Sequence, residues 1–301
     1  MKASSLAFGV AALPTAWAWG GFGHITVAYV ASNFVSNETA AYFQGLFRND
    51  TQDYLAGVAT WADSIRYTQW GRFTAPFHYI DAHDDPPSSC EVDYERDCKK
   101  EGCIVSAIQN YTSRLLSPAS SEQDRAIAAK FIVHFIGDIH QPLHDEDVAK
   151  GGNGIIVTFD HVRLNLHHVW DSSIAEKAVG GVRRQPYAEA RRWADELTAK
   201  INDGKFNASS TSWLEGVDLA DPVSSAMVWA REGNAFVCTT VMPQGPAAIT
   251  GQELGADYFE KAAPVVEIQI AKAGYRLAAW LDLIASNINS QSQAQSTMGD
   301  L

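Results

Sequence analysis

Two histidine–aspartate pairs, each with a spacing of four residues, constrain this chain more than any other feature of its sequence. His134 precedes Asp138, and His167 precedes Asp171. Residues four apart share one face of an α-helix, so each pair predicts a helix that presents an imidazole and a carboxylate together. Donors of these two kinds, without cysteine, suit Zn²⁺. One such pair is ordinarily a salt bridge or a hydrogen bond on a helix face, whereas two favour a metal-binding helical protein.

Further candidate ligands lie around these pairs. His144 falls between them, and His24 lies six residues from a predicted processing site. Asp63 and His78 lie upstream. A metal-free His–Asp catalytic dyad is the alternative, but no nucleophile-elbow motif accompanies the pairs. The set therefore favours a metal cluster.

The apolar periodicity predicts an all-α fold with at most a small β-hairpin. We expect one domain over residues 19–286, followed by a disordered polar tail over 287–301. The only β-rich stretch is 154–159, with a possible partner at 161–165. The expected helices span residues 23–35, 39–47, 53–66, 104–116, 122–139, 164–178, 187–201, 222–231 and 252–288, the last with a possible break near Pro264.

The first 18 residues have the pattern of a signal peptide. Lys2 provides a positive charge, residues 4–13 are apolar, and Ala16 and Ala18 form a small-x-small cleavage site. An uncleaved anchor is the alternative, but the apolar run is well short of the ~20 residues that span a bilayer. We expect cleavage after Ala18, a mature chain that begins at Trp19, and a secreted, extracellular protein.

The cysteines and glycosylation sequons fit an oxidising compartment. Four cysteines can form two disulfides in three pairings, and a Cys-x4-Cys zinc site is the weaker alternative. The cysteines are Cys90, Cys98, Cys103 and Cys238, and the Asn-x-Ser/Thr sequons begin at Asn37, Asn49, Asn110 and Asn207.

The charge balance is acidic. The chain has 23 basic and 35 acidic residues and a formal net charge of −12. This argues against a protein that binds duplex DNA through a broad basic surface. It leaves open a nuclease whose positive charge comes from metal ions.

The order of these motifs resembles that of the secreted single-strand-specific zinc nucleases and 3′-nucleotidases, most closely the fungal extracellular enzymes. These share a fold with the bacterial zinc phospholipases C. The resemblance extends from Trp19 to about Trp280, essentially the whole mature chain. The matching segments are residues 19–24, 61–63, 78–81, 134–138, 141–146, 151–153 and 165–171.

The resemblance implies three zinc ions per chain. The first is held by Asp63, His78, His134 and Asp138, and the second by His144, His167 and Asp171. The third takes the free amine and carbonyl of Trp19, the side chain of His24, and Asp138 as a bridge. Because the amine of Trp19 is free only after processing, signal-peptide cleavage would complete this site.

The resemblance also implies the reaction and the disulfide pairing. Asp63 orients the attacking water, Arg66 neutralises charge in the transition state, and cleavage leaves 5′-phosphorylated products. A surface salt bridge is the alternative role for Arg66. The cysteines pair as Cys90–Cys238 and Cys98–Cys103.

The implied partners are single-stranded DNA and RNA and 3′-nucleotides, with no membrane and a monomeric state. Tyr79 stacks on an unpaired base, while Asp81 and Asn153, beside Gly152, bind its edge. Lys150 replaces an apolar neighbour of some relatives. His83, His140, His161 and His168 match no ligand position and are expected at the surface or behind the ligands. The alternatives are a zinc phospholipase C and, less favoured, a non-catalytic zinc-binding glycoprotein.

Overall fold

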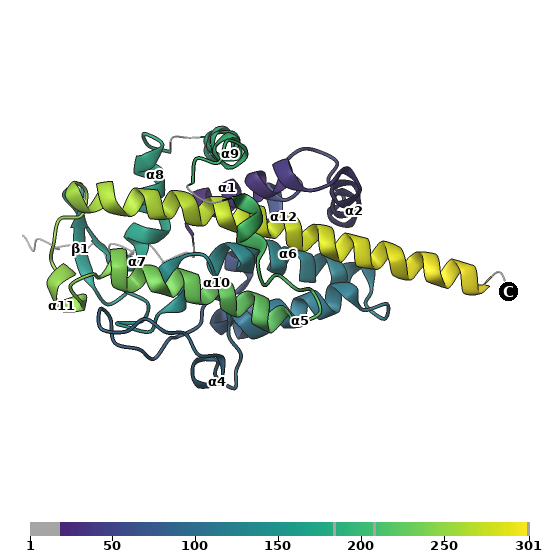
Figure 1. Cartoon of the computed structure of the whole chain (residues 1–301), viewed down its shortest axis with the longest axis horizontal. Coiled ribbons are helices and arrows are strands. Elements are labelled where there is room, and N and C mark those ends of the chain that lie inside the picture. Colours follow the sequence, from purple (N-terminus) through teal and green to yellow (C-terminus); the bar gives the residue numbers. More distant parts are fainter. Residues whose placement is uncertain (1–18, 183–184, 207–208, 300–301) are drawn as a thin grey trace, which may run out of the picture.

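The computed structural model describes residues 19–182, 185–206 and 209–299. The predicted signal peptide and the sequon residue Asn207 lie outside this part. Within it the fold is helical with one two-stranded sheet, as predicted (Figure 1). The longer helices are α1 (Gly21–Phe34), α2 (Asn37–Phe47), α5 (Ile104–Leu116), α6 (Glu122–Asp138), α9 (Pro186–Asn202), α10 (Pro222–Phe236) and α12 (Asp257–Gly299). The short helices are α3 (Trp61–Ile65), α4 (Tyr94–Asp97), α7 (Leu166–His168), α8 (Ile174–Ala178) and α11 (Pro246–Ile249). Short 3₁₀-helical or π-helical segments are η1 (Ala56–Val58), η2 (Arg72–His78), η3 (Pro142–Asp145), η4 (Val169–Ser173), η5 (Ser210–Leu214) and η6 (Val237–Val241).

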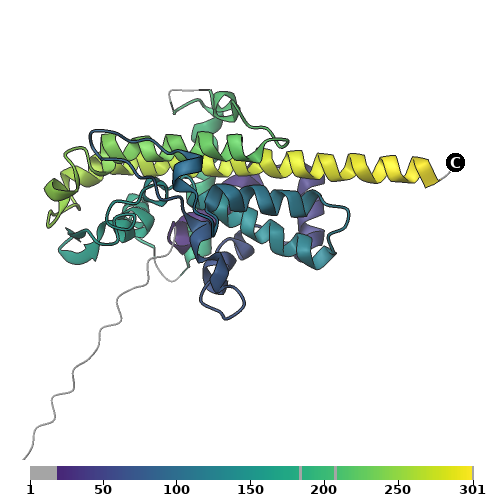
Figure 2. The same ribbon diagram turned by 90° about the horizontal axis from the view of Figure 1, so that it is seen from below.

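Helix α6 lies at the centre of the fold. It packs against α5, α12 and α1, and every residue from Phe131 to Asp138 is buried. A helix that is buried on all sides must be surrounded by other elements. Here α1 packs on α9 and α12, and α5 also contacts α10. Helix α12 runs along the molecule in both views (Figure 1 and Figure 2). The C-terminal turn of α6 therefore places His134 and Asp138 in the interior.

Two predicted helices are broken at the site. Residues 53–66 form η1 and α3, separated by Thr60, whose backbone angles are not helical. The break leaves the Ala59 carbonyl oxygen free to accept from His134 Nδ1 at 2.7 Å. The predicted helix 164–178 instead starts at Leu166, where the Asn165 side chain accepts from the His168 N–H.

The β-hairpin is confirmed. Strands β1 (Ile156–Phe159) and β2 (Val162–Asn165) pair antiparallel, with Ile156 opposite Asn165 and Phe159 opposite Val162. Because β2 leads directly into α7, the hairpin fixes the point at which the chain carrying His167 enters the site.

Helix α12 differs from the prediction in two places. It continues through Pro264 without a break and runs on to Gly299, where a disordered tail was expected. Burial along one side, at Val266, Ile270 and Leu277, outweighs the single backbone hydrogen bond that proline removes. From residue 289 onward the sequence is mostly polar, but each residue only extends an existing helix, which costs far less than nucleating one. No helix of the described part combines the length and apolarity needed to cross a bilayer.

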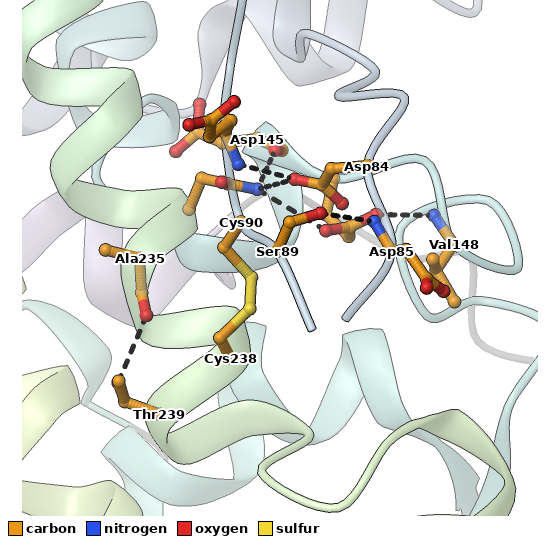
Figure 3. The surroundings of a disulfide bond; sticks show 12 residues. Asp84, Asp85, Ser89, Cys90, Asp145, Val148, Ala235, Cys238 and Thr239 are labelled. Atoms are coloured by element: carbon orange, nitrogen blue, oxygen red, sulfur yellow. Dashed lines mark hydrogen bonds between the residues drawn. A yellow bond between two sulfur atoms is a disulfide. The ribbon is translucent and has the colours of Figure 1, made fainter. Parts of the chain in front are cut away.

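Two disulfides hold the long loop over residues 82–102. Cys90–Cys238 ties it to η6 beside Asp84 and Asp145 (Figure 3), and Cys98–Cys103 closes its end. The predicted pairing is therefore confirmed.

A buried carboxylate holds the same loop from within. Asp97 Oδ1 accepts from the His83 N–H and Arg96 Nε, and Oδ2 accepts from the Asp93 N–H. Burial alone would raise the pKa of Asp97, but the hydrogen bonds from Arg96, Asp93 and His83 outweigh it and lower the pKa. The loop thus depends on Asp97 being ionised.

Candidate metal centre and active site

Asp138, the last residue of α6, joins two groups of ligand atoms. Its Oδ2 lies 2.9 Å from His78 Nδ1 and 3.1 Å from His134 Nε2, while its Oδ1 lies 3.0 Å from His24 Nε2. Asp63 Oδ1 lies 3.6 Å from His134 Nε2 and 3.9 Å from His78 Nδ1. Two ligands of a tetrahedral Zn²⁺ at about 2.0–2.1 Å are about 3.3 Å apart. The atoms of each group therefore have the spacing of ligands that surround one metal ion.

A third group lies on the segment that follows the hairpin and on η3. Asp171 Oδ2 is 3.2 Å from His167 Nε2, and Asp171 Oδ1 is 3.7 Å from His144 Nε2. The turn after His168 is of the π type, and it keeps Asp171 within reach of His167. The structure thus brings together the side chains predicted for the second zinc.

Backbone carbonyl oxygens set the orientation of three imidazoles. The Nδ1 atoms of His134, His144 and His167 lie 2.7, 2.6 and 2.6 Å from the carbonyl oxygens of Ala59, His78 and Gly151. A carbonyl can only accept, so each Nδ1 carries the proton and donates. The Nε2 atom of each ring faces the cluster and is the atom that can bind a metal ion, which is how metal-binding histidines are usually held.

Several buried polar atoms of the cluster lack hydrogen-bond partners. Both oxygens of Asp63 and both ring nitrogens of His24 are buried without one, as are His144 Nε2 and Asp171 Oδ2. Leaving so many polar atoms unsatisfied in the interior would be costly. The donor set contains imidazole and carboxylate only. Bound metal ions would provide partners for these buried atoms, and Zn²⁺ suits a set of imidazole and carboxylate donors.

Opposing charges shift the pKa values inside the cluster. Burial lowers the pKa of His78 to about 3. Burial also opposes protonation of His134, but the carboxylates of Asp138 and Asp63 outweigh it and raise the pKa of His134 to about 9. Against the effect of burial, His134 and His24 hold the pKa of Asp138 well below its usual value. The carboxylates that stabilise a proton on His134 would equally stabilise a metal cation.

Two glycines allow the close packing of the ligands. A Cβ on Gly137 would lie 2.8 Å from His24 Nδ1, so α6 accepts His24 only because this position lacks a side chain. Gly151 has φ of +58°, and a Cβ there would lie 2.6 Å from the Leu143 carbonyl oxygen. Glycine at 151 therefore lets its own carbonyl reach His167.

Trp19 is fully buried beside the cluster. A Cβ on Gly137 would lie 3.9 Å from Trp19 Cδ1, and the Gly20 N–H donates to the Asp171 carbonyl at 2.7 Å. The donors predicted for Trp19 are backbone atoms. The start of the described chain thus lies between α6 and the segment that carries Asp171.

A cavity of about 330 Å³ opens beside the metal-ligand groups. Several predicted site residues line it: Arg66, His78, Tyr79, Asp81, His144, Asn153 and His167. Arg66 Nη1 lies 3.7 Å from Asp63 Oδ1, and Tyr79 is 39% exposed. Gly152 does not line the cavity but lies against Leu143 behind its wall.

Sequence reasoning gave no role to two polar residues that the structure places here, Gln141 and Lys99. Gln141 is fully buried, its Nε2 donates to Asp171 Oδ1, and its Oε1 accepts from the Leu143 N–H, both at 2.6 Å. Lys99 Nζ donates to Asp81 Oδ2 at 2.6 Å. One carboxylate oxygen of Asp81 is therefore already hydrogen-bonded before a ligand binds. Lys150 lines the cavity. Gln141 stands in the matched segment 141–146, which was the available signal. The Lys99–Asp81 contact joins residues that are 18 apart in the sequence, and no sequence signal predicted it.

The remaining histidines lie outside the ligand groups. His161 is exposed and lies 3.8 Å from Glu253, and His83 pairs with Asp147. His140 is fully buried instead, where its Nδ1 donates to the Ile136 carbonyl and Arg276 donates to its Nε2. His140 therefore links α6 to α12.

Comparison with known proteins places this centre in a described family. The sequence matches the S1/P1 Nuclease family profile over residues 19–286. It is 52% identical to Nuclease S1 of Aspergillus oryzae over 271 residues, which are 90% of this chain and 93% of that protein. It is 46% identical to Nuclease P1 of Penicillium citrinum over 266 residues (88% and 97%). It is 34% identical to Endonuclease 4 of Arabidopsis thaliana over 286 residues (89% and 90%).

Proposed function

The chain belongs to the S1/P1 nuclease family, and from that membership we propose that it is a zinc-dependent phosphodiesterase that cuts single-stranded DNA and RNA. The observation that carries the proposal is the set of three ligand groups beside one cavity. We further propose that it releases 5′-phosphorylated products and also hydrolyses 3′-nucleotides.

The proposed metal content is three Zn²⁺ per chain. Asp63, His78, His134 and Asp138 would hold one ion, and His144, His167 and Asp171 a second. His24 and Asp138, with the amine and carbonyl of Trp19, would hold the third. The unpartnered buried atoms and short ligand spacings support this assignment. When bound, zinc lowers the pKa of water and supplies positive charge next to a phosphate.

Asp63 and Arg66 are the proposed catalytic residues. Asp63 is buried, and neither of its oxygens has a hydrogen-bond partner, so one can ligate while the other accepts from the attacking water. Arg66 follows one turn later and lines the cavity, where its guanidinium can stabilise negative charge that develops on the phosphate. Burial would lower the pKa of Arg66, but Asp63, Tyr67 and Asp138 together outweigh it and raise the pKa, so Arg66 stays charged.

Selectivity for single strands follows from the residues around the cavity. Tyr79 offers an exposed ring for stacking, and Asp81 and Asn153 offer polar atoms for a base edge. A base in a duplex has neither its faces nor its pairing edge available, so only an unpaired base can enter.

Secretion and processing are proposed from the sequence pattern and the fungal relatives. We propose cleavage after Ala18, a glycosylated extracellular protein and a monomeric state. Among the sequons, Asn37 and Asn110 are exposed and Asn49 is half-buried, so the first two offer the better acceptors.

A substrate panel tests the proposal. Single-stranded DNA, RNA, a duplex of the same sequence, 3′-AMP and phosphatidylcholine are offered to the zinc-loaded mature protein. We expect cleavage of the first two and of 3′-AMP, a much slower reaction on the duplex, and loss of activity on chelation with recovery on adding Zn²⁺. Cleavage of phosphatidylcholine alone would assign the protein to the phospholipases C, and no turnover at all would leave a zinc-binding glycoprotein.

A further inference from the structure

Three aromatic side chains stand exposed on the short stretch between α3 and η2 and at its junction with η2. Tyr67, Trp70 and Phe73 are 59%, 55% and 58% exposed. We call them the aromatic patch. The other large exposed apolar side chains of the described part, apart from Tyr79 at the cavity, are scattered over other elements. Clustered exposed apolar side chains mark binding surfaces, whereas scattered ones are ordinary.

Two rings of the aromatic patch, those of Trp70 and Phe73, are each supported on one side by another aromatic ring. The Trp70 ring lies 5.9 Å from that of Trp61, which in turn packs edge-on against Phe131. The Phe73 ring lies 5.9 Å from that of Phe77. Rings braced in this way lose little freedom when a flat ligand stacks on them.

The chain segment that carries the aromatic patch reaches the cavity at both of its ends. Arg66 lines the cavity, and its Nη2 donates to Tyr67 Oη at 3.0 Å, with its Cζ 5.1 Å from the Tyr67 ring. At the other end, η2 carries Phe73 and returns to the cavity at His78. The chain therefore leaves the cavity at Arg66, presents the three rings and re-enters at His78.

Positive charges accompany the rings. Arg66 adjoins Tyr67, Arg72 is exposed beside Phe73, and Lys130 Nζ lies 5.0 Å from the Trp61 ring that supports Trp70. This concentration stands out in a chain with a formal net charge of −12. Alternating aromatic and cationic groups match the bases and phosphates of an unpaired strand. An apolar protein partner would gain nothing from the cations.

We propose that the aromatic patch binds unpaired nucleotides of the substrate strand outside the cavity, by stacking of their bases on Tyr67, Trp70 and Phe73. The inference rests on the proposed nuclease function. The aromatic patch would bind only longer substrates, because a dinucleotide that fills the cavity cannot also extend over the three rings.

The test is the dependence of kcat/KM on the length of single-stranded DNA from two to eight nucleotides, with the zinc-loaded protein. We expect kcat/KM of the wild type to rise with length. The triple variant Tyr67→Ala, Trp70→Ala, Phe73→Ala should lose roughly five- to a hundredfold more on the octamer than on the dinucleotide. The double variant Trp70→Ala, Phe73→Ala keeps the contact between Arg66 and Tyr67, so it should lose activity on the octamer and keep its value on the dinucleotide. Trp70→Phe retains a stacking face and should keep most of the rise. Tyr187→Ala, which removes a 41% exposed ring on α9, is the matched control and should behave as the wild type.

The outcomes separate this inference from the proposed function. A wild type that cuts no oligonucleotide refutes the nuclease proposal itself. A second result is a wild type that cuts oligonucleotides and a triple variant that keeps the wild-type length profile or loses equally on the dinucleotide and the octamer. That result would overturn the proposed role of the aromatic patch and leave the nuclease proposal intact. Unchanged kinetics with altered sedimentation of the triple variant would assign the patch to self-association and overturn the proposal as well. Thermal unfolding of each variant checks that the fold is intact.

Discussion

Gln141 offers a sharp test of how the second zinc site is built. Its amide nitrogen donates to Asp171 Oδ1 at 2.6 Å, and its oxygen accepts from the Leu143 N–H in η3, the turn that carries His144. One buried side chain therefore positions two of the three predicted ligands. Gln141→Met keeps the approximate volume and removes both hydrogen bonds, whereas Gln141→Glu keeps the acceptor and replaces the donor with a charge that repels Asp171.

The expected magnitudes follow from these two contacts. Loss of a partner to a metal-ligating carboxylate typically lowers metal affinity by about 10- to 100-fold. That range corresponds to roughly 1.4–2.8 kcal/mol at this one site. In the metal-free protein, Gln141→Met leaves the buried Leu143 N–H without a partner, which costs about 1–3 kcal/mol of unfolding free energy. Gln141→Glu should keep that hydrogen bond and still lose zinc affinity.

The assay is a competition between protein and a chromogenic zinc chelator, followed by zinc per chain after dialysis. We expect both variants to release one zinc more readily than the wild type and to retain the other two. Urea unfolding with excess chelator should show a lower stability for Gln141→Met. Three zincs held as tightly in Gln141→Met as in the wild type would refute the positioning role. Loss of all three together would show that the sites are not independent.

Three further predictions concern catalysis, processing and acid stability. Asp63→Asn should lower kcat on single-stranded DNA by about 10²- to 10⁴-fold without changing the circular dichroism spectrum; wild-type turnover in this variant would rule out the assigned role. One extra residue before Trp19 should weaken one of the three zincs because no free amine remains, and equal zinc affinity in both proteins would argue against Trp19 as a ligand. The lowered pKa of Asp97 means that its contribution to folding is present above about pH 3.9, the ordinary value for aspartate, and disappears as the pH falls through the lower folded value. Asp97→Asn should therefore destabilise the metal-free protein by about 2–3 kcal/mol at pH 6 and progressively less in acid; a difference independent of pH would contradict this.

The sequence predicted those parts of the site that depend on local spacing. His134 with Asp138, and His167 with Asp171, share a face because they are four residues apart, and the structure brings each pair within 3.2 Å. Spacing alone could not bring His24 of α1 to Asp138. That meeting depends on packing between distant segments, and only the family resemblance anticipated it.

Tertiary contacts explain the features that periodicity missed. The break between η1 and α3 lets the Ala59 carbonyl turn to His134, and no local propensity marks it. Helix α12 continues through Pro264 because burial of its neighbours outweighs one lost hydrogen bond. In both cases a long-range interaction outweighs the local conformational preference on which the prediction was based.

Anomalous diffraction tests the central claim most directly. Crystals of the mature, zinc-loaded protein are measured on both sides of the zinc absorption edge. We predict three peaks that vanish below the edge, two of them sharing Asp138 and the third next to His144, His167 and Asp171. An anomalous map without peaks at these groups, from crystals of a protein that cuts single-stranded DNA, would contradict the account.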